Sequence, residues 1–219
     1  MVNTFIEIIV IILYIYVFYK YFAYKKCCKK NIEINNINNL SGIEIIQKIL
    51  DKNKLDKVYI VQTKNPYYYG YSTKRKVLRV SKKLFNDTTV TDTYQAALLA
   101  SYAVEDSKND KFYMYSYIKT LLYVLNIICY IGIIISAFLR DFYIIKICLV
   151  ILILIILITM FISNYEYKLL SKIIDELVSD KILNKNDEEL LNNISNKVVI
   201  QPIQIVTKFI DYINYKLNN

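Results

Sequence analysis

The chain of 219 residues contains no histidine and no tryptophan, and it has only three glycines and two prolines. Histidine is the commonest general base near neutral pH and a frequent zinc ligand, so its absence removes both of these possibilities and strongly constrains the function. Four cysteines are present, but none forms a Cys-x-x-Cys pair that would indicate a thiolate zinc site. We therefore expect no bound metal and no cofactor.

Apolar residues make up 55% of the chain and the mean hydropathy is +0.29, yet 21% of the residues are charged. Apolar and charged stretches must therefore alternate along the chain. The net charge of +9 predicts an anionic partner, and we favour lipid headgroups over nucleic acid because lysines cluster beside the apolar spans. The many Ile, Asn, Lys and Tyr residues are typical of an AT-rich genome.

Three apolar stretches, residues 4–24, 118–139 and 142–163, are long enough to cross a bilayer. Four lysines follow the first stretch, so the positive-inside rule places the N-terminus outside. Only two residues separate the second and third stretches, which predicts an antiparallel helical hairpin. These features predict an integral protein of a bacterial plasma membrane, with an organellar inner membrane as the alternative.

Residues 25–117 are predicted to form a small domain on the cytoplasmic or inner side. Within it, the patterns predict strands near 58–61 and 76–81, and helices over 43–50 and 88–105, the last capped by Asp87 or Thr88. Residues 31–40 are read as a polar linker. After the third span, residues 164–219 are predicted to form amphipathic helices on the same side, with 198–217 lying at the membrane interface. The fold class is therefore α+β.

Four stretches, in this order, are similar to one family. They are Ser41-Gly42-Ile43-Glu44, the strand from Lys76 to Ser81, the turn from Phe85 to Val90, and the helix from Lys172 to Leu177, which follows the hairpin. The chain resembles the bacterial membrane-bound neutral zinc metallopeptidases of the YugP-like family. This resemblance implies that residues 25–117 are a zincin-like domain carried by three transmembrane helices.

In that family, the helix after the turn carries the motif AAHECGHA, whose two histidines bind zinc while the glutamate between them activates water. Counting from Asn86 places Leu98 and Tyr102 at the histidine positions and Leu99 at the glutamate position. A third ligand, a glutamate in the family, falls near Ser163, and Glu166 lies three residues further on. The resemblance therefore implies a degenerate member without the zinc motif.

Two pairs of residues and one asparagine are candidates for other roles. Glu105 and Asp106 are neighbours on a helix and diverge, which favours a solvated helix end over a shared site. Cys27 and Cys28 lie beside a predicted span, where reversible acylation is a candidate modification and two free thiols are the plainer interpretation. Asn126 lies deep in the second predicted span, where a packing role is the default interpretation and a hydrogen bond to the third span or to another subunit is the alternative.

A basic cluster surrounds the strand near residue 78, with tyrosines 67–69 and 71 close by in sequence. Nucleic acid could stack on such tyrosines, but anionic lipid explains the lysines more simply in a membrane-tethered domain. The strand itself is predicted to be an exposed sheet edge that binds an extended partner segment. The cluster comprises Lys74, Arg75, Lys76, Arg79, Lys82 and Lys83, and the predicted edge comprises Lys76, Val77, Leu78, Arg79 and Val80.

Three functional hypotheses follow. The first is a catalytically inactive relative of membrane zinc metallopeptidases, a pseudoenzyme kept as a membrane scaffold or partner-binding protein. The second is a structural subunit of a larger membrane complex. The third is an active membrane peptidase with a site of unfamiliar type.

Overall fold

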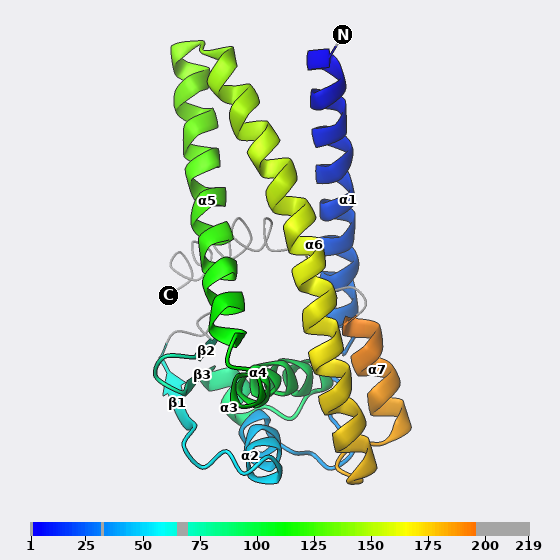
Figure 1. Cartoon of the computed structure of the whole chain (residues 1–219). Helices are drawn as coiled ribbons and strands as arrows, with labels where there is room; N and C mark the ends of the chain where they lie inside the picture. Colours follow the sequence, from blue (N-terminus) through cyan, green and yellow to red (C-terminus); the bar gives the residue numbers. More distant parts are fainter. Residues whose placement is uncertain (1, 32, 65–69, 196–219) are drawn as a thin grey trace. The chain divides into compact units, whose positions relative to one another are not determined.

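The computed structural model describes residues 2–31, 33–64 and 70–195, and it divides into two compact units. Among the described residues, the first unit takes the chain up to Ala23 together with Tyr117–Asn164; we call it the apolar unit. The second, here the α+β unit, takes Tyr24–Ser116 and the residues from Tyr165 to 195. Figure 1 shows the elements of both units, coloured along the sequence.

The apolar unit contains parts of three helices, α1 (Val2–Asn31), α5 (Phe112–Leu139) and α6 (Phe142–Ser179). Among the described residues, α5 and α6 are the two helices that are long and apolar enough to cross a membrane. Their hairpin is confirmed, and it turns at Arg140, whose φ is 57°. The predicted first span, residues 4–24, lies within α1, and its crossing of a membrane stays a prediction.

Side chains between α5 and α6 form a small core that contains Cys129, Cys148 and Leu152. A Cβ atom added to Gly132 would lie 3.0 Å from the Cys148 sulfur, so the missing side chain lets the helices approach closely here. Asn126 is buried, with 1% of its surface exposed, and its Oδ1 has no hydrogen-bond partner among the described residues. Its burial means that Asn126 faces the interior of this unit.

Helix α6 is longer than the sequence predicts. The prediction ended a span at residue 163 and began a separate amphipathic helix, whereas the structure has one helix of 38 residues. No glycine or proline interrupts Phe142–Ser179, so nothing in the sequence breaks the backbone hydrogen-bond ladder. The helix therefore changes from an all-round apolar composition to a single apolar stripe without ending.

The α+β unit begins with α2 (Gly42–Lys52), which has a capping box at its start. The Ser41 N–H donates to Glu44 Oε2 at 2.7 Å, and the Glu44 N–H donates back to Ser41 Oγ at 3.5 Å. A Cβ atom at Gly42 would lie 2.1 Å from the carbonyl oxygen of Leu84, so only glycine fits this approach. The Ser-Gly-x-Glu sequence thus fixes both the start of α2 and its contact with α3 (Lys82–Asn86).

The sheet has three strands in the order β1-β3-β2, namely β1 (Tyr59–Thr63), β3 (Val77–Ser81) and β2 (Gly70–Ser72). Strand β1 is parallel to β3 and β2 is antiparallel to it. The prediction that residues 76–80 form an exposed edge is therefore wrong, because β3 is the central strand. The cause is β2, a short strand that the sequence pattern did not reveal and that covers the second side of β3. Lys76 lies just before β3, with a φ of 49°.

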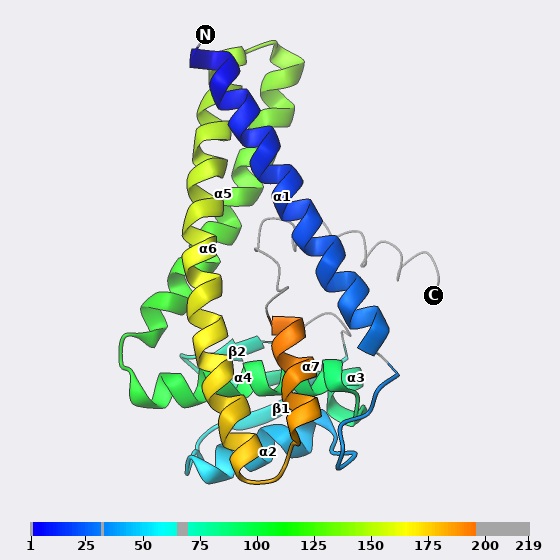
Figure 2. The same cartoon turned by 90° about the vertical axis from the view of Figure 1, so that its right-hand side faces the viewer.

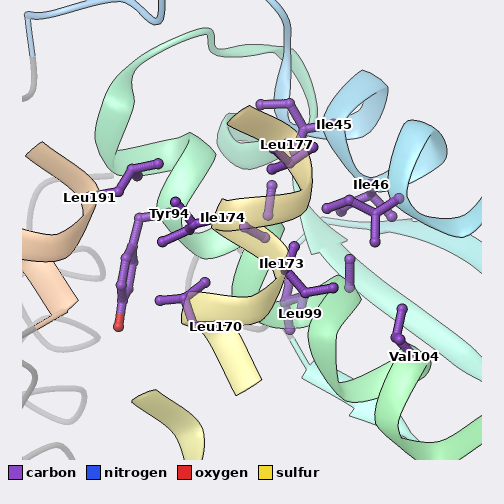
Figure 3. Close-up of a cluster of buried hydrophobic side chains, with 14 of the residues drawn as sticks. Ile45, Ile46, Tyr94, Leu99, Val104, Leu170, Ile173, Ile174, Leu177 and Leu191 are labelled. Carbon is purple, nitrogen blue, oxygen red and sulfur yellow. The ribbon is translucent and has the colours of Figure 1, made fainter. Parts of the chain in front are cut away.

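Helix α4 (Val90–Lys108) packs against α2, β3 and α7 (Lys185–Ser195). Figure 3 shows the shared core, in which one turn after another of α6 contributes aliphatic side chains between α4 and α2. Figure 2 shows α7 beside the C-terminal part of α6, where Leu191 closes the core. Among the largest fully buried side chains of this core are Ile45, Ile46, Leu78, Leu170 and Ile174.

The predicted polar linker, residues 31–40, is held in place by side-chain hydrogen bonds in its described part. Asn36 is buried and its side chain donates to the carbonyl oxygens of Leu40 at 2.7 Å and Thr88 at 2.9 Å. Asn38 donates to the carbonyl oxygen of Ile182 at 2.7 Å. These two amide side chains thus bind backbone carbonyl groups in three different segments, and this holds residues 33–40 in place without a helix or strand.

Candidate functional site

The candidate site lies on α4, the helix that the family resemblance makes the metal-binding helix. Its N-cap is Thr89, whose Oγ1 accepts the Asp92 N–H at 3.2 Å and whose hydroxyl donates to Asp92 Oδ2. The predicted caps, Asp87 and Thr88, are wrong by one or two residues, since Asp87 ends α3 instead. Burial raises the pKa of the Asp92 carboxyl, with Thr89 opposing that shift.

The three positions on α4 that correspond to the family motif have different surroundings. Leu99, at the position of the family's catalytic glutamate, is 3% exposed and belongs to the hydrophobic core (Figure 3). Leu98, at the first histidine position, is partly buried against the same core. Tyr102, at the second histidine position, alone presents a polar group. Two of the three positions therefore carry apolar side chains that pack in or against the hydrophobic core.

The hydroxyl of Tyr102 donates to Glu166 Oε1 at 2.6 Å, and the hydroxyl of Tyr115 donates to the same oxygen at 2.5 Å. The three residues come from α4, α5 and α6, and all belong to the α+β unit. The residue that faces the old histidine position is therefore Glu166. Ser163, to which a count along the sequence assigned the third ligand, belongs to the other unit.

Aromatic rings surround this carboxylate. Tyr115 stacks on Phe112 with 5.1 Å between ring centroids, and it lies 5.2 Å from the ring of Tyr165. Burial, reinforced by the negative charge of Glu166, raises the pKa of Tyr102 well above its ordinary value. The Tyr102 phenol therefore remains protonated and remains a hydrogen-bond donor throughout the neutral range.

The next two carboxylates on α4 also bind tyrosines. Tyr165 donates to Glu105 Oε1 at 2.9 Å, and Tyr71 donates to Asp106 Oδ2 at 2.5 Å. The Asp106 side chain is only 7% exposed and forms an ion pair with Lys76 at 2.6 Å. The two carboxylates do diverge as predicted, but the prediction of a solvated helix end is wrong, because tertiary partners from β2 and α6 cover them.

We tested whether these residues could hold the zinc that the family implies. Zinc prefers His, Cys and carboxylate ligands in a tetrahedral set. Across the described residues, no three side chains of His, Cys, Asp or Glu come together in such a set. At the motif positions the donors are one phenol and Glu166, whose Oε1 already accepts two hydrogen bonds. This donor set does not fit a zinc ion.

Cys27 and Cys28, the candidate acylation sites, are partly buried against the core of the α+β unit. Burial raises the pKa of the Cys28 thiol to about 11. Because the thiolate is the reactive form, this environment makes Cys28 a weak nucleophile at neutral pH. Acylation at these two residues stays a prediction.

The basic cluster is only partly available as a surface. Lys74 and Arg75 are exposed, but Lys76 is engaged by Asp106 and Arg79 is partly buried on the central strand. Lys83 lies near both Cys28 and Asp92, since its charge acts on both groups. The structure therefore distributes these cations around the unit, and a role in binding lipid or nucleic acid stays a prediction.

The sequence contained one signal for the tyrosine–glutamate cluster that counting missed. Glu166 is the first acidic residue after the long apolar run of α6. A carboxylate at the border of a hydrophobic core requires a hydrogen-bond or ion-pair partner. A tyrosine in place of a histidine supplies that partner. The pairing with Tyr115 could not be predicted, because it depends on where α5 packs.

One comparison with known proteins identifies a family for this chain. The family model described as "Putative neutral zinc metallopeptidase" matches residues 6–209, which is nearly the whole chain. No curated protein and no solved structure matches the chain. The match includes the hairpin and the four stretches on which the resemblance rests, and it also includes α4 and Glu166. The chain therefore belongs to the neutral zinc metallopeptidase family that this model describes.

Proposed function

We propose that this chain is a non-catalytic member of its family, which serves as a membrane-anchored scaffold or partner-binding protein. The observation that carries the proposal is the closed cluster at the motif positions. Glu166 accepts hydrogen bonds from Tyr102 and Tyr115 on one oxygen, where a peptidase would need zinc and its activated water. Leu99 replaces the general base with a buried hydrocarbon side chain.

Retention of the surrounding scaffold supports this proposal. The capping box of α2, the required glycine at position 42 and the alanine-lined face of α4 are all intact. A chain that needed only a membrane anchor would not require this packed α+β unit. Its preservation without the zinc ligands favours a binding role over loss of all function.

The proposal includes attachment to a membrane. Helices α5 and α6 have the length and composition of membrane spans. We propose that α1 supplies a third span, and that the α+β unit lies on the cytoplasmic or inner side. The exposed lysines from residue 25 to residue 30, with the net charge of +9, would then favour a surface of anionic lipid headgroups.

Zinc analysis of the full-length protein, purified in mild detergent without chelators, tests the proposal directly. We expect no stoichiometric zinc and no cleavage of a casein substrate. Leu98→His combined with Tyr102→His is the matched control, since it places two imidazoles at i and i+4, the second of them at the position that contacts Glu166. This double variant should gain zinc. The proposal would be overturned if the natural chain contained stoichiometric zinc and cleaved casein, and if Glu166→Gln abolished both the zinc binding and the cleavage.

A further inference from the structure

The outer edge of β1 lies at one end of the sheet in the α+β unit. Among the described residues, β1 pairs with β3 alone, and the order β1-β3-β2 makes it a terminal strand. An edge strand presents unpaired N–H and C=O groups to any extended chain that approaches it. The question is which groups β1 presents and what kind of segment would match them.

The direction of each backbone group follows from one hydrogen bond. The Tyr59 N–H donates to the carbonyl oxygen of Lys76 at 2.9 Å, so the peptide groups of Tyr59 face β3. Because successive residues of a strand alternate in direction, Ile60 and Gln62 direct their N–H and C=O groups to the outer edge. Two residues thus offer a short ladder to an added strand.

The side chains on this strand also favour an added strand. Tyr59 is 67% exposed and Val61 is 45% exposed, on the same face of the sheet. Exposed edges are usually protected by a lysine, a proline or a bulge within the strand, and Tyr59–Thr63 has none of these. An aromatic and a β-branched residue at alternate positions instead provide good cross-strand contacts.

The charged residues near β1 indicate which kind of partner segment it would bind. Lys57 and Lys64 flank the strand and are exposed, and Arg79 lies opposite Val61 on the central strand. Asp56 is the one acidic residue among those adjoining the strand from 55 to 64. Pairing of β1 with β1 of a second copy would bring like charges together at both ends, which disfavours self-association.

We propose that the outer edge of β1 binds an extended, acidic segment of a partner protein as an additional strand. Ile60 and Gln62 form the backbone hydrogen bonds, Tyr59 and Val61 contact the apolar residues of the segment, and Lys57 and Lys64 bind its flanking carboxylates. This inference rests on the proposed function, because it names the partner class of a partner-binding protein.

The test uses the full-length protein in detergent and a labelled probe peptide, Glu-Thr-Val-Thr-Val-Thr-Glu, with its lysine-flanked counterpart as control. Gln62→Pro removes an outward N–H while the ladder to β3 keeps its donors, and Gln62→Ala keeps the outward N–H. We expect the acidic peptide to bind and the lysine-flanked one not to bind. Gln62→Pro should weaken binding about tenfold or more, because a lost backbone hydrogen bond also displaces its neighbours.

Gln62→Ala should stay within about twofold of the natural chain. Val61→Glu provides a second variant in case the proline disturbs folding, and its added charge should repel the acidic peptide. Absence of binding, equal binding by Gln62→Pro and Val61→Glu, or dimerisation through β1 would each overturn the inference. The zinc assay is independent of the peptide-binding assay. A protein that contains no zinc, cleaves no casein and does not bind the acidic peptide would therefore contradict only the edge-strand inference.

Discussion

The two sides of α4, the helix that aligns with the family's metal-binding helix, differ in how their side chains are held. The core side is lined by alanines with at most 1% exposure, at residues 96, 97, 100 and 103, and packs closely against α2 and the sheet. The other side carries Tyr102, Glu105 and Asp106, each hydrogen-bonded to a residue of another element. Packing on the first side constrains residue size, whereas the second side needs only a partner for each polar group.

The largest expected effect contrasts Leu99 with Leu98, adjacent residues of the old motif. Leu99→Ala should lower the free energy of unfolding by about 2–5 kcal/mol, because it leaves a cavity in a closed core. Leu98→Ala should cost clearly less, since its side chain is only partly buried. Guanidinium titration in mild detergent, followed by near-ultraviolet circular dichroism, measures both. Equal losses would contradict the distinction between the two positions.

The second prediction removes the shared acceptor of the tyrosine cluster. Glu166→Leu should lower the free energy of unfolding by about 1–3 kcal/mol, because it leaves the Tyr102 and Tyr115 hydroxyls without their carboxylate. Glu166→Gln should cost less, since an amide oxygen still accepts. Ser163→Ala is the control and should change stability by no more than about 0.5 kcal/mol. A larger loss with Ser163→Ala than with Glu166→Leu would argue against our assignment of the site.

The third prediction concerns alkaline pH. The pKa of Tyr102 is raised above its ordinary value of 10.0, so its contribution to stability is complete below about pH 10 and is lost as the pH rises further. Tyr102→Phe should cost about 1 kcal/mol at pH 8 and should then lose less stability than the natural chain at higher pH. Denaturation midpoints between pH 8 and pH 11 test this. Tyr113→Phe, at an exposed position, is the control and should change stability at pH 8 by no more than about 0.5 kcal/mol.

The smallest expected effect compares two ion pairs of the same length, Lys52–Asp180 and Lys76–Asp106, both at 2.6 Å. Lys52→Met should change the free energy of unfolding by about 0–1 kcal/mol, because both members of the Lys52–Asp180 pair are exposed and water screens them. Lys76→Met should lower the free energy of unfolding by an amount at or above the upper end of that range, because it leaves the nearly buried Asp106 carboxylate without its cation. Denaturation at low and high salt separates the two, and a larger salt effect on Lys76–Asp106 would contradict this ranking.

Much of the α+β unit could be predicted from sequence pattern. The predicted helix over 43–50 corresponds to α2, the predicted strand over 76–81 to β3, and the predicted helix over 88–105 to α4. Each has a strong local signal: a capping box, an alternating apolar run, or a repeated alanine stripe. The short strand β2 has no such signal, so its pairing with β3 was missed and the central strand was mistaken for an edge.

The candidate site divides in the same way. The loss of the zinc motif was visible from the sequence, since no alignment can supply a histidine that the chain does not contain. The sequence offered both Ser163 and Glu166 for the third position, but a count along α6 could not choose between them, because three residues turn a side chain by most of a helical turn. Only the packed structure could choose Glu166 over Ser163.

The sequence by itself determined the family, the apolar hairpin and the absence of imidazole chemistry, because these depend on composition and on local order along the chain. Tertiary structure decided that Tyr102, Tyr115 and Glu166 meet, that β1 and not β3 has the open edge, and that Glu105 and Asp106 are covered. These outcomes depend on contacts between distant segments. In such contacts each buried polar group must find a partner, and local pattern does not specify which one.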